Sequence, residues 1–443
     1  MKKILAMLLA AMATLSVVAC TGETTETPDV VEPVVSDTVV SDTEVEPEVH
    51  NFNIYAWNEE FKGFFEAYYE VPEGVTVNWI INPSADGVYQ QKLDEALLNQ
   101  ANADDNDKVD MFLAEADYIL KYVESDYSMG IDEIGYENAD TMYQYTIDAV
   151  TDSNGVCKGV SFQCCPSALI YRRSIAKDVL GTDDPAEVQE FVSDWDKFAD
   201  VAAQAAAKGY MITSNYAATY RVFSNNCTIP WVDENNTLQF DEGINKWIEQ
   251  TKVFMDNGYT QNLSLWDGSE QGVDGKAMCF FGPAWYFNFS MTTAQAETSG
   301  DWAICKGPQA HFWGGTWLLA AAGSDDAEIL KDVFETFTIN EDVCTKLVSE
   351  QNQYPNNTAV VDKFANDATY GSAFLGGQND IALFATMAGD IKWENHTEYD
   401  QLLNEKLQEF MLDYFTGTVD YETALNSYYD YVEETYPDIV IEG

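Results

Sequence analysis

Aromatic and carboxylate residues stand together at the ends of two predicted strands. Residues 52–57 alternate apolar and polar side chains as a strand does, and Trp57-Asn58-Glu59 ends this run. A second apolar run over 109–114 leads to Glu115 and Asp117. Indole rings, carboxylates and amides are groups that stack on a ligand and hydrogen bond to it. The spacing therefore favours a binding site at the ends of strands.

Two further tryptophans stand beside glycines. Trp285 follows Gly282-Pro283 at the end of a predicted buried strand over 275–282, and Trp313 precedes Gly314-Gly315. Glycine lets a backbone approach a ligand closely, which favours a cleft position for both rings. Core packing is the more common place for a single tryptophan, and for Trp317, beside an apolar run, core and cleft are equally good interpretations.

Motifs for catalysis and for metal binding are absent from the sequence. It contains no GxSxG elbow, HExxH motif, Walker A motif or GxGxxG motif. The three histidines lie far apart, so we expect no metal site and no cofactor. A pair of carboxylates can always be drawn among 75 acidic residues, so such a pair does not identify a glycosidase.

The charge balance excludes other classes of partner. The 443 residues include 22 Lys+Arg and 75 Asp+Glu, a formal net charge of −53. This argues against nucleic-acid binding and against docking on anionic lipid through a basic patch. With 46% hydrophobic residues the chain can still bury a large core, and its length allows two or three domains.

The N-terminus predicts export and a lipid anchor. Lys2 and Lys3 precede an apolar run, which is typical of a signal peptide over 1–19. The run ends Val17-Val18-Ala19-Cys20, which resembles a bacterial lipobox, so we expect cleavage before Cys20 and acylation of that residue. Residues 20–50 are acidic, with no Lys, Arg or aromatic residue, and predict a disordered tether. No later apolar stretch is long enough to span a membrane.

Strands alternate with helices in the first part of the remaining chain. Strands are predicted over 52–57, 75–81 and 109–114, and helices over 61–69 and 90–102. This order indicates βαβ units and a largely parallel sheet, in which ligands bind beyond the carboxyl ends of the strands. Seven cysteines remain after Cys20, and their odd number leaves at least one thiol without an intrachain partner.

Short sequence segments occur in a characteristic order from about residue 50 to residue 435. They are Tyr55-Ala56-Trp57-Asn58, Asp110-Met111-Phe112, residues 162–171, Asp194-Trp195-Asp196-Lys197-Phe198, Gly275-Lys276-Ala277-Met278 with Gly282-Pro283-Ala284-Trp285, Trp313-Gly314-Gly315, and Phe415-Thr416-Gly417-Thr418-Val419 with Ala424-Leu425. Behind a lipobox, this ordered set resembles the extracellular solute-binding proteins of family 1, the sugar-binding lipoproteins of ABC importers and relatives of maltose-binding protein.

The resemblance implies an α/β fold of two lobes, like that of periplasmic binding proteins, with a ligand cleft between them. It implies an N-terminal lobe of 51–163 and 317–357 and a C-terminal lobe of 164–316 and 358–443, with three crossings near 162–166, 314–318 and 354–359. It also implies a monomer that is not an enzyme. This monomer would be held by its lipid anchor on the extracellular face of the bacterial cell membrane, where it would deliver a sugar or oligosaccharide to the ABC transporter permease subunits.

A sugar site needs aromatic plates for C–H faces and planar polar groups for hydroxyls. The candidate ligand-binding residues are Trp57, Asn58, Glu59, Glu115, Asp117, Gln163, Trp231, Trp285, Tyr286, Trp313, Gly314, Trp317 and Tyr354. Two alternatives stay open at this point. The same fold could bind a polyamine or another cationic solute through carboxylates and aromatic faces, and a surface glycoside hydrolase could use a carboxylate pair.

Overall fold

The computed structural model describes residues 50–441. The predicted signal peptide, the lipidation site Cys20 and all but the last residue of the predicted tether lie outside these residues. Within 50–441 no helix is both long and apolar enough to cross a membrane. The seven cysteines in this part of the chain are all free thiols.

The first sheet has five strands in the order β2-β1-β3-β9-β4. They are β1 (His50–Ala56), β2 (Val75–Ile81), β3 (Met111–Glu115), β4 (Gly159–Ser161) and β9 (Thr316–Ala320). β1 pairs in parallel with β2 and β3, whereas β9 runs antiparallel to β3 and β4. Side chains alternate between the two faces, so that Met111 and Leu113 enter one core and Phe112 and Ala114 enter the other.

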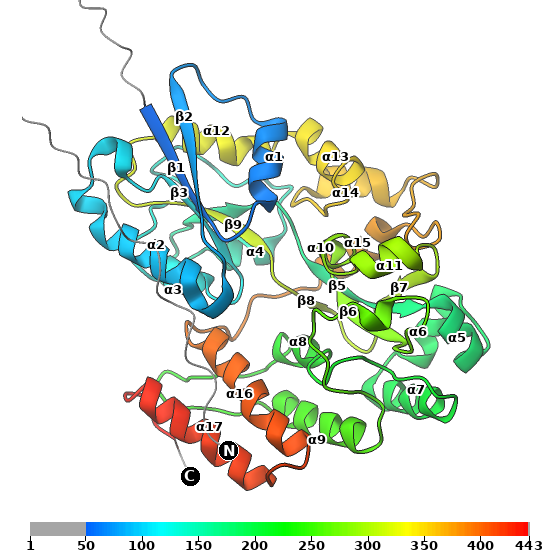
Figure 1. The fold of residues 1–443 in the computed structure, drawn as a ribbon. Coiled ribbons are helices and arrows are strands. Elements are labelled where there is room, and N and C mark those ends of the chain that lie inside the picture. Colours follow the sequence, from blue (N-terminus) through cyan, green and yellow to red (C-terminus); the bar gives the residue numbers. More distant parts are fainter. Residues whose placement is uncertain (1–49, 442–443) are drawn as a thin grey trace, which may run out of the picture. The chain divides into compact units, whose positions relative to one another are not determined.

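Helices cover both faces of this first sheet, as Figure 1 shows. The core around Met111 is closed by α1 (Glu60–Tyr68), α12 (Ala327–Thr338) and α13 (Glu341–Ser349). The opposite core is closed by α2 (Val88–Asn99) and α3 (Ile119–Val123), and α4 (Gln144–Asp148) precedes β4. The sheet with these helices is called the first half below.

The second sheet is antiparallel, and the prediction of a parallel arrangement concerned only β1, β2 and β3, which do pair in parallel. Its order is β6-β5-β7, and β8 also pairs with β5. The strands are β5 (Pro166–Arg172), β6 (Cys279–Gly282), β7 (Trp302–Cys305) and β8 (His311–Phe312). Helices separate β5 from β6 and β6 from β7 in sequence, whereas β7 and β8 follow each other without a helix.

Helices cover the second sheet on both faces as well. One core contains α10 (Ala284–Phe289), α11 (Thr292–Glu297), α14 (Thr358–Ala365) and α15 (Asp380–Ala388). The other contains α5 (Arg173–Leu180), α6 (Pro185–Phe191) and α7 (Trp195–Ala207). A further core joins α8 (Tyr220–Ser224), α9 (Glu242–Asp256), α16 (Asp400–Phe415) and α17 (Tyr421–Thr435). The second sheet with all these helices is called the second half.

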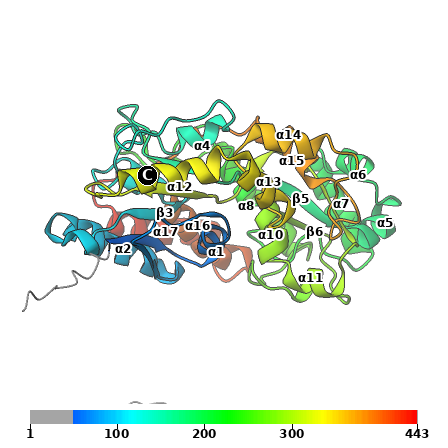
Figure 2. The ribbon, with the colours of Figure 1, turned by 90° about the horizontal axis from the view of Figure 1, so that it is seen from above.

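The chain passes between the two sheets at three places. Residues 162–165 join β4 to β5, residues 313–315 join β8 to β9, and residues 350–357 join α13 to α14. The first and third crossings lie side by side, because Cys164 N donates to Tyr354 O at 2.8 Å and Asn356 N donates to Phe162 O at 3.1 Å. Helices α12, α13 and α14 follow this path from one half to the other (Figure 2). The division into lobes at particular residues stays a prediction.

Candidate ligand-binding site

A cleft of about 1770 Å³ lies between the two halves. On the first half it is lined by residues that follow β1 and β3 and by α2. On the second half it is lined by α8, α10 and the start of α16, and residues 313–316 line it at the second crossing. The carboxyl ends of the parallel strands β1 and β3 open toward it, which is where α/β sheets place ligands.

Eight of the residues predicted from the sequence line this cleft. They are Trp57, Asn58, Glu115, Asp117, Gln163, Trp285, Trp313 and Gly314. The fold thus brings together strand-end polar groups of the first half and two tryptophans of the second half. Their individual roles in binding stay predictions.

Three tryptophans of the second half form one aromatic surface, called the tryptophan wall: Trp266, Trp285 and Trp313. The ring centroids of Trp285 and Trp313 are 5.3 Å apart, and those of Trp266 and Trp313 are 5.6 Å apart. Trp285 Nε1 also donates to the Trp313 carbonyl at 3.3 Å. Trp266 is not among the residues predicted from the sequence; it is 58% exposed and lies in an irregular segment. A glycine two residues after it was the one available signal.

Tyr286 and Trp231 lie behind the cleft surface, not on it. Tyr286 is 1% exposed, and its ring supports the back of Trp313 at a centroid distance of 5.7 Å. Trp231 donates Nε1 to Asn404 Oδ1 at 3.0 Å and lines a separate cavity of about 30 Å³. Neither ring presents a face to the cleft, in contrast to the expectation from the sequence.

Tyr354 differs from the expected cleft position, and for Trp317, which is counted among the candidate ligand-binding residues, the structure shows the core position that the sequence leaves open. Each is 1% exposed. Trp317 packs in the core closed by α2 and α3 and donates Nε1 to the Thr146 carbonyl at 2.9 Å. Tyr354 shares a hydrogen bond with Tyr143 Oη at 2.7 Å and packs on the core of the second half. The alternation of β9 explains the placement of Trp317, because it shares its sheet face with Leu319.

Glu60, not the predicted Glu59, turns into the cleft. The side chain of Glu59 is 78% exposed and lies 3.7 Å from Lys62 Nζ. Glu60 begins α1 and lines the cleft, where Gln353 Nε2 donates to its Oε1 at 3.3 Å. Burial raises the pKa of Glu60 to about 7, although the Gln353 hydrogen bond opposes this. Glu59 precedes α1 and Glu60 is its first residue, so the start of the helix decides which of the two adjacent acids faces inward.

Gly314 allows a close approach between the two walls. Its φ of +66° lies in the left-handed region, which favours glycine. A Cβ at this position would lie 3.1 Å from Glu115 Oε1 and 3.7 Å from the ring of Trp285. A side chain at this position would therefore crowd Glu115, and glycine lets the backbone pass between this carboxylate and the indole ring.

A charged group of three side chains stands at the centre of the cleft. Both Arg221 Nη atoms donate to the two carboxylate oxygens of Asp117, which links α8 of the second half to the end of β3. The Asp117 backbone N–H donates to Glu115 Oε2 at 2.9 Å. Burial raises the pKa of Glu115 to about 8, and the charge of Asp117 adds to this rise while Arg221 opposes it. Arg221 also lies 5.8 Å from the centroid of the Trp313 ring.

Sequence reasoning missed Arg221 because α8 is only five residues long and shows no helical periodicity. The scarcity of basic residues in an acidic chain was the available signal. The pair it forms with Asp117 gives this carboxylate a cationic partner and leaves the second lone pair of each of its oxygens for another donor.

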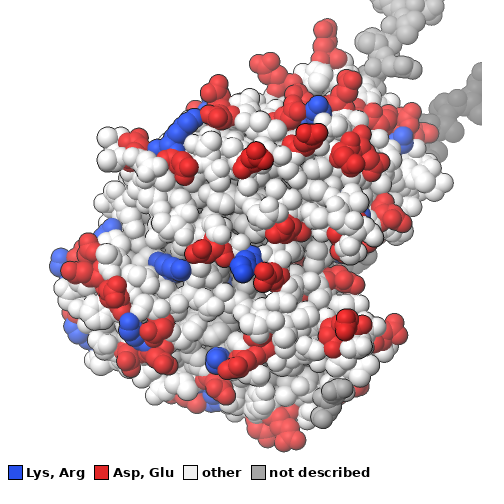
Figure 3. All heavy atoms as spheres, turned by 180° about the vertical axis from the view of Figure 1, so that it is seen from behind, with Lys and Arg blue, Asp and Glu red and all other residues white. Residues whose placement is uncertain are grey.

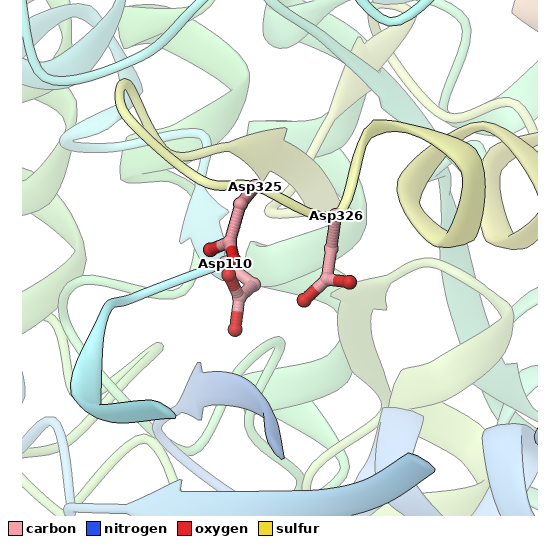
Figure 4. A group of neighbouring side chains, drawn as sticks. All are labelled: Asp110, Asp325 and Asp326. Atoms are coloured by element: carbon pink, nitrogen blue, oxygen red, sulfur yellow. The ribbon is translucent and has the colours of Figure 1, made fainter. Parts of the chain in front are cut away.

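A second acidic group lies at the other end of the first sheet, shown in Figure 4. One carboxylate oxygen each of Asp110, Asp325 and Asp326 lies within 4.8 Å of the others. His50 hydrogen bonds to Asp326, and Lys108 Nζ lies 3.7 Å from Asp325. Burial raises the pKa of Asp110 to about 7, and hydrogen bonds from residues 53 and 324 oppose this. His50 and Lys108 neutralise part of the negative charge of the three carboxylates. The group is separate from the cleft.

Comparison with known families identifies the class of protein. The chain belongs to the bacterial extracellular solute-binding proteins, because the family of that description matches residues 65–372. None of the curated proteins that were compared matches the chain.

Solved structures share the fold at low sequence identity. An extracellular solute-binding protein of family 1 is 16% identical, with a TM-score of 0.72 over 87% of this chain and 99% of that one. The ABC transporter associated binding protein from B. animalis subsp. lactis Bl-04, in complex with β-1,6-galactobiose, is 18% identical, with a TM-score of 0.67 over 89% and 100%. The sugar-binding protein MalE from Xanthomonas citri is 12% identical, with a TM-score of 0.66 over 87% and 96%. The predicted family and the two-lobe α/β fold are thus confirmed.

Proposed function

We propose that this protein captures a sugar or an oligosaccharide in the cleft and delivers it to the permease subunits of an ABC importer. The observation that carries this proposal is the tryptophan wall, which faces amide and carboxylate side chains across one cleft. Sugar rings stack their C–H faces on indoles, and their hydroxyls bond to planar polar groups. Two of the similar structures are of sugar-binding proteins with such a fold, which supports the same class of ligand.

Capture requires contacts that form between the two halves. The Arg221–Asp117 pair joins them at the centre of the cleft, and Gln90 Nε2 donates to Gln401 Oε1 at 3.0 Å between α2 and α16. Only a few residues cross between the sheets, so the halves can rotate about the crossings without unfolding. A ligand that contacts both walls would then favour the closed arrangement.

The cellular setting follows from the family and from the N-terminal sequence. The proposal includes export, acylation at Cys20 and a monomer anchored by lipid on the outer face of the bacterial cell membrane, with no catalytic activity. The acidic segment 20–50 would act as the spacer between the lipid and the binding protein.

A panel of neutral mono-, di- and oligosaccharides tests this function by thermal shift and calorimetry. We expect at least one sugar to raise the melting temperature, by an amount that grows with the logarithm of the ratio of sugar concentration to Kd. The sugar should be recovered intact. Release of a shorter product would instead indicate a glycoside hydrolase. If no neutral or charged sugar changes the melting temperature, the proposed class of ligand is wrong.

A further inference from the structure

The cleft is larger than a sugar of one or two rings requires. Its volume of about 1770 Å³ exceeds the roughly 300–1,000 Å³ of a pocket for a drug-sized ligand, which is the size of a disaccharide. The two halves already touch across it, through the Arg221–Asp117 pair and the hydrogen bond from Gln90 to Gln401. The volume therefore does not come from halves that stand apart, and it suits a ligand of several rings.

The cleft also extends beyond the tryptophan wall. On the first half, one face of α2 lines it from residue 90 to residue 98, a length of about 12 Å at 1.5 Å per residue. On the second half, it is lined by α10 and by the residues that follow α10 up to Thr292. These two helices lie apart in both Figure 1 and Figure 2, and the cleft reaches from one to the other.

Phe289 is an aromatic residue of the cleft that belongs to none of the cores described above. It ends α10, is 64% exposed and lines the cleft. Trp285 lies four residues before it, so the two rings project from the same face of the helix, about 6 Å apart along its axis. This offset is comparable with the advance of one ring along a sugar chain. Consecutive sugar rings can therefore lie on Trp285 and on Phe289.

The backbone that carries Phe289 is held in place on both sides. Asn288 Nδ2 donates to the Asn352 carbonyl at 3.1 Å, which ties the end of α10 to the third crossing. Gln271 Nε2 donates to the Ser290 carbonyl at 3.3 Å, and the hydroxyl of Ser290 is available beside the ring for a sugar hydroxyl. A ring on a fixed backbone loses little entropy when a ligand covers it, so Phe289 is suited to binding.

The charges of the protein favour a neutral sugar chain over an acidic one. Side chains of Asp and Glu are spread over both halves in the view from behind, with fewer Lys and Arg among them (Figure 3). The basic residues that line the cleft within residues 50–441 each have a carboxylate partner: Lys121 with Asp94, Arg221 with Asp117, and Lys406 with Glu409. An anionic sugar would meet a negative field without a free cation to bind it.

We propose that the ligand is a neutral oligosaccharide of at least three rings, and that Phe289 binds the ring next to the tryptophan wall. This inference rests on the proposed function and narrows its class of ligand. The ring centroids of Trp266 and Trp285 are 6.5 Å apart, so the wall itself offers places for two sugar rings. A disaccharide occupies the wall, which is the larger aromatic surface, and a longer chain reaches Phe289 as well. Phe289 therefore sets how strongly affinity depends on chain length.

Calorimetry with sugar chains of increasing length tests the inference. The probes are the di-, tri-, tetra- and pentasaccharides of α-1,4-glucan, β-1,4-glucan, β-1,4-mannan and β-1,4-xylan and of the linkage that the thermal-shift panel identifies, with α-1,4-galacturonan as the acidic comparison. We expect the Kd of at least one neutral series to fall about tenfold or more from the disaccharide to the tetrasaccharide. Phe289→Ala should remove most of this gain, roughly fivefold to tenfold for the loss of one aromatic face.

Three comparisons keep the result specific to Phe289. Phe289→Trp should keep the gain, because it restores a flat ring. Trp285→Ala should weaken the binding of every chain length. Phe191→Ala removes another exposed ring, at the end of α6 and outside the cleft wall, and should leave every affinity unchanged. Phe289→Ala should keep the melting temperature of the wild type, since the ring is exposed.

The outcomes separate this inference from the proposed function. Equal affinities for the disaccharide and the longer chains overturn the inference and leave the proposed function standing. A gain with chain length that survives in Phe289→Ala overturns the assignment of Phe289. Tighter binding of galacturonan than of every neutral chain overturns the expected neutrality of the ligand. If no sugar of any length binds, the proposed function fails, and the inference fails with it.

Discussion

Replacement of Trp285 by alanine is the sharpest test of the tryptophan wall. Trp285 is partly exposed in the cleft and lies 5.3 Å from Trp313. A fully buried aromatic side chain removes about 150–250 Å² from water, and a sugar ring that covers one face of Trp285 covers about a third of this area. The variant then loses roughly 50–80 Å² of apolar contact with the sugar. At about 25 cal/mol per Å² this amounts to ~1–2 kcal/mol, which weakens the Kd by roughly fivefold to thirtyfold.

Calorimetry with the sugar identified by the thermal-shift panel measures this loss. Far-UV circular dichroism should stay unchanged, and the free energy of unfolding should fall by only about 1 kcal/mol, because Trp285 packs on the edge of a core. Trp79→Ala is the matched control. Trp79 is a half-buried tryptophan on β2 that packs 5.5 Å from Phe65 and lies outside the cleft wall. Trp79→Ala should lose stability and keep its affinity. If Trp285→Ala behaves in the same way, Trp285 is structural and the argument for the wall fails.

Three other predictions follow from separate parts of the molecule. Arg221→Ala leaves the half-buried Asp117 without its partner. We expect chemical denaturation to show a free energy of unfolding lower by about 1–3 kcal/mol, a smaller loss than for a fully buried pair, and Arg221→Lys should lie between Arg221→Ala and the wild type. The folded-state pKa of Asp110, about 7, lies above its usual value, so the stability that this group contributes is lost as pH rises from 4 to 7. Asp110→Asn should therefore gain about 1–3 kcal/mol over the wild type across that interval in urea titrations, and a constant difference contradicts this. Cys20→Ala should move the protein from the membrane fraction to the medium or the periplasm with unchanged affinity, and membrane retention would exclude the lipid anchor.

The part of the site that could be predicted from sequence is the part set by strand ends. Trp57, Glu115 and Asp117 could be found because β1 and β3 are regular, parallel and directly followed by polar residues. Trp285 could be found because a glycine and a proline end the strand before it. In these cases the local pattern alone determines where the side chain lies.

The rest of the site depends on tertiary structure that no local pattern contains. Glu59 and Glu60 are chemically alike, and the residue at which α1 begins decides which of them faces the cleft. Trp266 lies in an irregular segment, and Arg221 lies in a helix of five residues, so periodicity marks neither. Trp317 could have been assigned to the core from the alternation of β9, once Leu319 was recognised as its neighbour on the same face.

The crossings explain why the walls can carry specificity without weakening the fold. Near the first and second crossings, Ser161 Oγ donates to the Thr316 carbonyl at 2.8 Å and Gln163 Nε2 donates to Thr316 Oγ1 at 3.1 Å. These buried hydrogen bonds fix the floor of the cleft. They thereby fix Glu115, which pairs with Thr316 in the sheet, and Gly314, which lies two residues before Thr316 in the chain. Trp266 and Trp285 stand on segments outside this network. Substitutions there change what the cleft recognises, whereas substitutions in the floor change whether the two walls meet.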